Sequence, residues 1–210
     1  MADVNVYAAA DRAIKSMNRE ILRYFGQLKL ADWDEVHVIR TVKAVYRKST
    51  RKARARYYEV AFEAYLLGLE LCGYDRKRAY GLAEKAITVE WVDRVMSEPN
   101  PVTGYRFDTE AERKAERLAE TLEVAAKRNV EIDKAIRYWS QQCGQFAINV
   151  TDYAMVEAFE DAGIEFVRWI TQKDERVCRE CGPRDEVIFA IDEIPTKHYR
   201  CRCWLKPVRN

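Results

Sequence analysis

Apolar residues recur every three or four positions along most of residues 1–163, which is the spacing of one face of an α-helix. Glycine and proline, which interrupt helices, are sparse in this part of the chain. The longest uninterrupted pattern begins with a capping residue at Asp32 and extends to about Cys72. A helix of this length would span roughly 60 Å, so we expect either a break near Ser49 and Thr50 or a rod that projects from the body.

The pattern continues beyond this long helix but changes near residue 163. After this long helix, another helical stretch covers about 76–98 and ends at the run PNPVTG. Two or three further helices are expected over 110–163. The segments IEFVRWIT, VIFAI and CWLKPV then suggest short strands, because they are rich in β-branched and aromatic residues. The sequence therefore predicts a mainly α fold, with a helical body over 1–163 and a small β-rich module over 164–210.

Composition adds a local charge asymmetry to this picture. Lys and Arg total 36 and Asp and Glu total 34, so the net charge of +2 does not imply nucleic-acid affinity of the whole chain. Residues 40–56 nevertheless contain eight basic residues and no acidic one. A face of this kind can contact DNA, RNA or an acidic protein surface, or it can be a solvated helix face that pairs with acidic neighbours. The basic residues are Arg40, Lys43, Arg47, Lys48, Arg51, Lys52, Arg54 and Arg56.

No N-terminal stretch has the form of a secretory signal, and no uncharged apolar run approaches the roughly 20 residues of a membrane span. We therefore expect a soluble protein whose cysteines are not paired in disulfides.

Four of the six cysteines fall within the last 33 residues and carry the clearest chemical signal. Their spacing is Cys178-x-x-Cys181, sixteen residues, then His198-x-x-Cys201-x-Cys203. Zn²⁺ prefers four such ligands in a tetrahedron, and each short spacing can form a metal-binding knuckle. Cys203 can replace Cys201 as the fourth ligand, or it can lie beside the metal and donate to a thiolate. Reduced thiols without a metal are the alternative.

Several neighbours are predicted to support this site. Trp169 would pack the module against the helical body, Asp174 would accept backbone N–H groups of the first knuckle, and Gly182 would supply a positive φ. A module of this size rarely folds on its core alone, so metal binding would contribute to its folding. Three thiolates and one imidazole leave Zn²⁺ with a charge near −1, which the neighbouring arginines can offset. These are Arg176, Arg179, Arg200 and Arg202.

The segments WITQKDERVCRECG and HYRCRCWLKP resemble the C-terminal signature of phage head morphogenesis proteins, the group that includes the Mu protein F-like minor head proteins. The preceding VTDYAMVEAFEDAG is similar to the family's lead-in, although Val150-Thr151-Asp152 departs from the Arg-Thr-Glu often seen there. The helical body agrees with the family only in type. The residues that match are Trp169, Thr171, Asp174, Glu175, Arg176, Val177, Cys178, Cys181, Pro195, His198, Cys201, Arg202 and Cys203.

This resemblance implies a non-enzymatic minor head protein with a structural zinc ion. Such a protein would dock on the portal or the inner capsid, be present in several copies in the virion head, and pass through the host cytoplasm during assembly. Packaged DNA is a further expected contact. Two alternatives are kept: a zinc-dependent nuclease or hydrolase with Asp174, Glu180 or Asp185 as its base, and a nucleic-acid-binding protein that uses helix 40–56.

Overall fold

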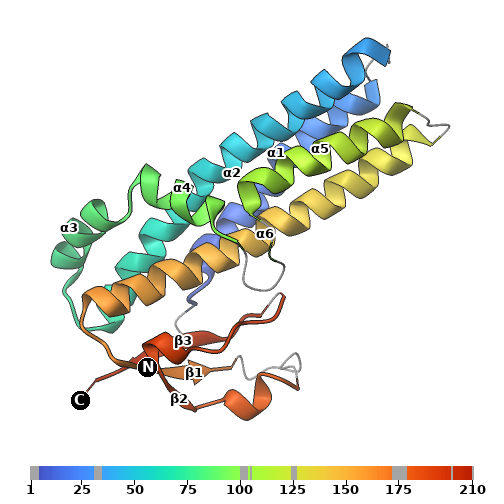
Figure 1. Ribbon diagram of the computed structural model, residues 1–210. Helices are drawn as coiled ribbons and strands as arrows, with labels where there is room; N and C mark the ends of the chain where they lie inside the picture. Colours follow the sequence, from blue (N-terminus) through green and yellow to red (C-terminus); the bar gives the residue numbers. More distant parts are fainter. Residues whose placement is uncertain are drawn as a thin grey trace.

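The protein is described by a computed structural model that covers residues 5–30, 35–99, 104, 106–123, 127–171, 179–199 and 201–209. Four long helices lie side by side in an elongated bundle, and two short helices cover the outer side of its second helix (Figure 1). The long helices are α1 (Ala8–Gly26), α2 (Glu35–Leu71), α5 (Phe107–Glu123) and α6 (Arg128–Asp161), and the short ones are α3 (Arg76–Ala86) and α4 (Val89–Ser97).

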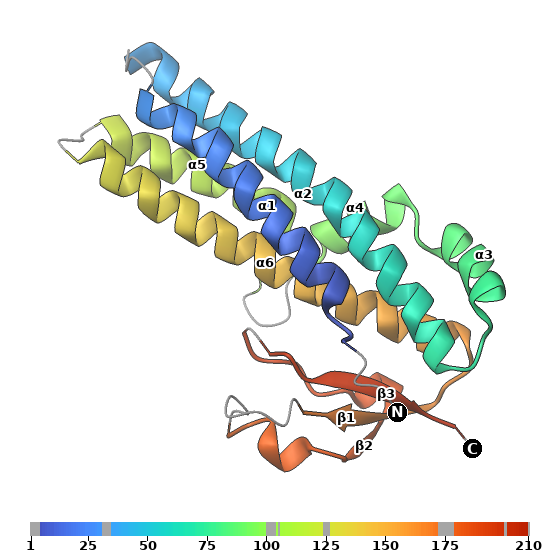
Figure 2. The same cartoon turned by 180° about the vertical axis from the view of Figure 1, so that it is seen from behind.

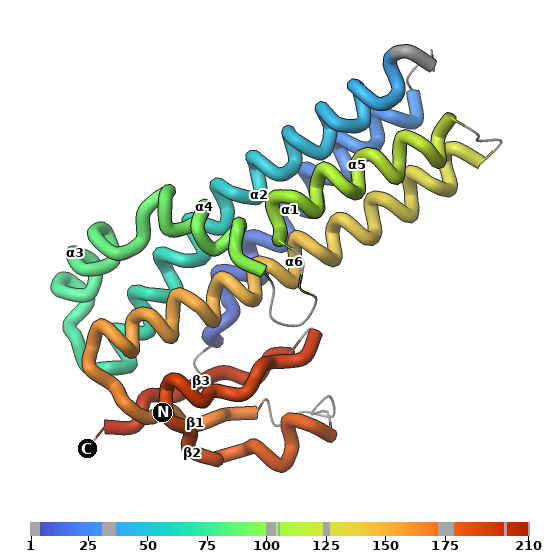
Figure 3. Tube along the Cα trace, viewed as in Figure 1, coloured from blue at the N-terminus to red at the C-terminus, as the bar shows by residue number. Residues whose placement is uncertain are grey.

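A three-stranded antiparallel sheet follows the bundle and lies beside the end at which α1 begins and α6 ends (Figure 2). Its order is β2-β1-β3, and Figure 3 shows the chain passing from α6 directly into β1. The mainly α fold with a small β-rich module is thus confirmed. The strands are β1 (Phe166–Ile170), β2 (Ile188–Ala190) and β3 (Trp204–Val208), and the short 3₁₀ helices of the chain are η1 (Gln27–Leu30), η2 (Gly182–Arg184) and η3 (Ile191–Glu193).

Helix α2 runs without a break through Ser49 and Thr50, and it packs against α1, α5 and α6 instead of projecting alone. The Ser49 hydroxyl is buried, donates to the carbonyl of Tyr46 at 2.8 Å, and accepts the indole N–H of Trp139 at 2.8 Å. Thr50 donates to the same carbonyl at 2.9 Å. Both hydroxyls are therefore satisfied inside a continuous helix, so the expected break is wrong.

Aromatic side chains hold the middle of the bundle together. The Tyr46 ring lies 4.9 Å from that of Phe25 and 5.2 Å from that of Trp139, measured between centroids. Phe107 stacks on Trp139 at 5.3 Å and on Phe146 at 4.5 Å. These contacts join α1, α2, α5 and α6 in one aromatic layer, with ring spacings at which aromatic pairs attract one another.

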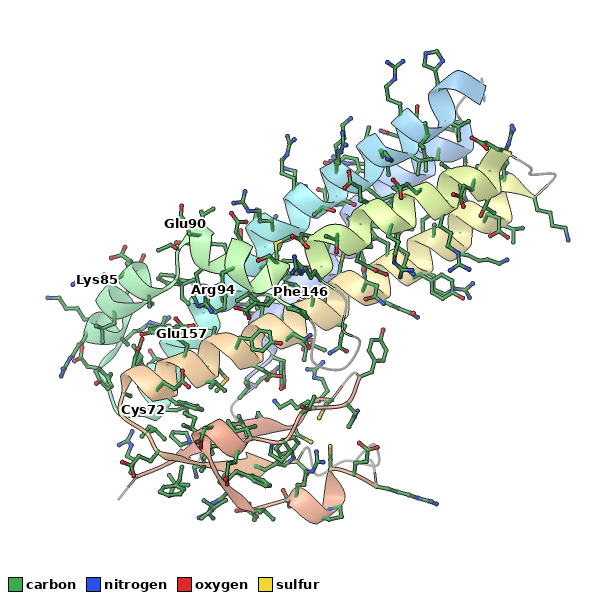
Figure 4. All side chains as sticks on the ribbon, in the orientation of Figure 1. Cys72, Lys85, Glu90, Arg94, Phe146 and Glu157 are labelled. Atoms are coloured by element: carbon green, nitrogen blue, oxygen red, sulfur yellow. The ribbon has the colours of Figure 1, made fainter. Side chains whose placement is uncertain are left out.

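The stretch predicted as one helix over 76–98 is two helices, because Thr88 is extended and caps α4 by accepting the N–H of Trp91 at 3.2 Å. The Trp91 indole N–H donates to Glu157 at 2.5 Å, and Arg94 donates to the same carboxylate at 3.3 Å. Figure 4 shows Arg94 on α4 beside Glu157 on α6. These bonds fasten α4 to α6.

Near the end of the chain, Arg209 caps the last turn of α2 by donating to the carbonyl of Leu71 at 2.6 Å. Gly73, with a φ of 85°, lets the backbone turn beneath this guanidinium.

Within the described ranges, no helix has the length and apolar character needed to cross a membrane.

Helix α2 packs tightly against α6 at Gly68, where an added Cβ would lie 2.7 Å from the Cβ of Ala158. We therefore expect Gly68→Ala to push the helices apart and to lower the free energy of unfolding by about 1–3 kcal/mol. Gly81→Ala in α3 is the control: a Cβ there has nothing within 4 Å, and removing a helical glycine should raise stability by about 0.5–1 kcal/mol. Urea denaturation measures both, and effects of the same sign would contradict this account of the α2–α6 contact.

Candidate metal centre

Three side chains of the C-terminal module bring their ligand atoms together. The sulfur atoms of Cys181 and Cys201 lie 3.6 Å apart, and Nε2 of His198 lies 3.2 Å from the Cys181 sulfur. All three ligand atoms lie within 4.8 Å of one another, and both cysteines are buried. A group of two thiols and an imidazole at this spacing can hold a metal ion.

Two turns place these side chains. The amide of Cys201 donates to the carbonyl of His198 at 3.1 Å, which closes the predicted second knuckle. Cys181 directly precedes η2, and its carbonyl accepts the amide of Arg184 at 3.0 Å. Gly182 begins this 3₁₀ turn and has no positive φ, so that prediction is wrong: the chain leaves Cys181 in a right-handed turn that needs no glycine conformation.

The imidazole of His198 is oriented as metal-binding histidines usually are. Its Nδ1 lies 2.9 Å from the carbonyl oxygen of Tyr199, an acceptor, so the ring proton belongs on Nδ1. Nε2 then presents its lone pair on the side where Cys181 lies. A backbone carbonyl that fixes the tautomer in this way is typical of histidines that bind a metal.

Cys203 lies next to the group of three and is also buried. A hydrogen bond from the Cys201 thiol lowers the pKa of Cys203 to about 6, and Lys197 contributes in the same direction. The same bond and burial raise the pKa of Cys201 above its usual range. These opposite shifts favour negative charge on Cys203, which a nearby cation would stabilise.

Trp169 lies on the buried face of β1 and is fully shielded from solvent. Its ring lies 6.3 Å from that of Phe189, and the cations of Arg184 and Lys197 lie 5.3 and 5.8 Å from its centroid. The indole N–H has no hydrogen-bond partner of normal geometry among the residues that the structure describes, and it helps to lower the pKa of Cys203. A buried donor of this kind suits a neighbouring thiolate, so Trp169 supports the cysteines as well as the core of the module.

Lys197, which sequence reasoning missed, lowers the pKa of both Cys201 and Cys203 through its positive charge. Its ammonium group donates to Asp152 at 2.7 Å, to the carbonyl of Cys203 at 2.7 Å and to the Tyr7 hydroxyl at 3.1 Å. Arg202, one of the arginines expected to offset the thiolates, instead binds Asp11 with two bonds of 3.0 Å. Lys197 directly precedes a ligand in the sequence, but two of its partners, Tyr7 and Asp152, are distant in the chain.

Some predicted residues do not enter this geometry. Cys178 and Asp174 lie outside the described residues, as do Arg176 and Arg200. Arg179 and Glu180 are exposed and Asp185 is half-buried; the Asp185 carboxylate accepts the amide of Thr171 at 2.9 Å. The first predicted knuckle is therefore represented by Cys181 alone.

The basic run of α2 divides into two sets. Four members form ion pairs with acidic residues: Lys43 with Glu116, Arg47 with Glu112, Arg54 with Asp93, and Arg56 with Glu59. The other four are exposed and form no ion pair with any residue that the structure describes: Arg40, Lys48, Arg51 and Lys52. We call this second set the basic ridge.

A groove of about 690 Å³ lies between α4, α5, α6 and the segment 191–199. Lys197 and Asp152 line it, whereas Cys181, His198 and Cys201 do not.

Comparison with known proteins gives no assignment: no protein-family model, no curated protein and no solved structure matches this chain.

Proposed function

We propose that this chain is a phage minor head protein whose C-terminal module is held by a structural zinc ion. The observation that carries the zinc proposal is the convergence of Cys181, His198 and Cys201, which come from two turns separated by sixteen residues of sequence. With Zn–S of about 2.3 Å and Zn–N of about 2.0–2.1 Å, ligand atoms of a tetrahedron lie about 3.5–3.8 Å apart. The observed 3.6 and 3.2 Å are close to this spacing. Cys203 or Cys178 supplies the fourth ligand.

The environment of these ligands supports a structural ion and not a catalytic one. Cys181 and Cys201 are only 1% and 2% exposed. A catalytic zinc keeps a position open to water and needs a base nearby. Asp185, one candidate base of a hydrolase, already accepts the amide of Thr171. The 690 Å³ groove, which could admit a substrate, is not lined by the ligands.

The role in the phage head rests on the resemblance of the C-terminal segment, and the shape of the molecule supports it. A long bundle with a small module fixed at one end offers extended helical faces for docking on the portal or the inner capsid. The zinc keeps the end module in one conformation. The chain acts in head morphogenesis and remains in several copies in the virion, after assembly in the host cytoplasm.

Full-length protein purified without chelators is expected to contain about one Zn²⁺ per chain. Substituted Co²⁺ should give the absorption bands of a tetrahedral thiolate site, and Cys181→Ser or Cys201→Ser should lower metal content at least tenfold, because each removes a ligand. Cys72→Ser is the matched control, since Cys72 directly follows α2 and is not among the three grouped side chains, so the metal should stay in place. Elemental analysis that finds no zinc in the unsubstituted protein would remove the zinc proposal.

The full-length chain should also co-purify with the portal or major capsid protein encoded in the same genome, and mass spectrometry should find it in purified particles. Cys201→Ser tests the part played by the module, because it leaves the helical faces unchanged. Binding that survives this substitution assigns docking to the helices. Absence of the chain both from particles and from the co-purified complexes would overturn the assembly role.

A second activity, binding of nucleic acid, is favoured by the basic ridge. Every exposed charged residue of α2 between Arg40 and Lys52 is a cation. The ridge follows one helix for about 18 Å, which covers several phosphates of a duplex. The ion-paired members of the run lie beside the acidic residues of α5 and α4 and are less available. In the proposed head protein, packaged DNA would be the partner of this ridge.

Replacement of Lys48, Arg51 and Lys52 by Ala tests this contact. Duplex DNA binding, measured by fluorescence anisotropy, should weaken at least tenfold, and the slope of log K against log salt should fall by about 3, because roughly one counterion is released per phosphate contact. The control replaces Lys15, Lys77 and Lys85, which are exposed on α1 and α3 and give the same change in net charge. Equal losses in both triple variants would show that net charge, and not the ridge, governs binding.

A further inference from the structure

The loop that carries two of the proposed zinc ligands also carries the residues that hold the module against the helical body. The two roles alternate along the chain: Lys197 contacts the body, His198 and Cys201 face the metal group, and Arg202 contacts the body again. The backbone of Cys203 belongs to the second role, because its carbonyl accepts from Lys197 at 2.7 Å. One stretch of seven residues must therefore adopt a conformation that satisfies both sets of contacts.

The first contact with the body is largely shielded from water. The side chains of Lys197 and Asp152 are 13% and 17% exposed, and their ion pair measures 2.7 Å. The Tyr7 hydroxyl lies 2.8 Å from the Asp152 carboxylate and 2.7 Å from the carbonyl of Cys203, so it bridges α6 and the loop. An ion pair in this environment has little freedom to shift, because each displaced polar group would lose its partner.

The second contact joins the loop to α1. Arg202 binds the carboxylate of Asp11 through both terminal nitrogens at 3.0 Å, and its guanidinium lies 4.9 Å from the centre of the Tyr7 ring. The two side chains are 38% and 36% exposed, so the pair is accessible to water, but its two-bond geometry fixes the direction of Arg202. Arg202 lies between Cys201 and Cys203, and fixing it therefore limits where both sulfur atoms can lie.

We propose that metal binding and docking of this loop on α1 and α6 are thermodynamically coupled, and that Asp11 and Asp152 are positioning residues for the metal centre. Both belong to the helical body: Asp11 acts through Arg202, and Asp152 acts through Lys197 and the Tyr7 hydroxyl. When docking has already ordered the loop, metal binding no longer has to offset the conformational entropy lost on ordering, so the metal binds more tightly. By linkage, bound metal strengthens docking by the same factor. The inference rests on the zinc site proposed above.

The test uses Asp11→Asn in the full-length chain. Asp11 is half-exposed on α1, so its loss leaves the bundle folded, which circular dichroism checks. The affinity for Zn²⁺, measured by competition with a chromophoric chelator, should fall about fivefold or more, the usual scale of coupling between sites. Asp11→Glu keeps the charge and should recover most of the affinity. Glu63→Gln is the matched control: it removes the carboxylate partner of Arg12 on α1, and Glu63 forms no ion pair with the described residues of the module.

The effect of the metal on docking is measured by hydrogen exchange at the start of α1. The amides followed are those of Ala8 and Asp11, which donate to the backbone carbonyls of Asn5 and Tyr7. Removal of zinc from the unsubstituted chain should speed exchange there, because the loop then no longer holds Tyr7 and Asp11. Unchanged zinc affinity in Asp11→Asn, or the same loss in Glu63→Gln, would overturn the coupling while leaving the zinc site intact. Unsubstituted protein that binds no zinc would overturn both.

Discussion

A sheet with strands of five, three and five residues buries too little apolar surface to fold alone, and the whole C-terminal module depends on what compensates for this. Two kinds of contact do so. One is internal, the group of Cys181, His198 and Cys201, and the other is external, the bonds from the loop and the last strand to α1, α2 and α6. Because the buried residues of both parts form one continuous cluster, the module is an extension of the core of the bundle.

The sequence predicted the fold class and the main members of the candidate site because their signals are local. Helical periodicity needs neighbours three and four residues away, and a knuckle needs two ligands within a few positions. The cap at Thr88 is also local, since a threonine precedes the helix that it caps, and attention to it would have divided the stretch 76–98 correctly. In each of these cases the residues that decide the structure lie within one turn of one another.

The errors and omissions concern partners that are distant in sequence. The Ser49 hydroxyl is buried inside a continuous helix, where it donates to the nearby Tyr46 carbonyl and accepts from Trp139, which lies 90 residues later. Arg202 was expected to balance the thiolates, but it binds a carboxylate 191 residues away, and it is Lys197 that helps to lower the pKa of Cys203. Nothing in the spacing of charges reveals such pairs, because any acidic residue of the chain is a possible partner until the helices are packed.

The arrangement of the helices also sets a length. Helix α6 has 34 residues, about 50 Å at 1.5 Å per residue, and it runs from the end near η1, where Lys29 meets Asp133 at 2.6 Å, to the end that bears the sheet. Packed helices resist bending far more than a flexible linker does. Two structures bound at opposite ends of the bundle would therefore be held at a fixed separation. A matched loss of seven residues from each long helix would shorten the bundle by about 10 Å and bring two structures bound at its ends closer by that distance.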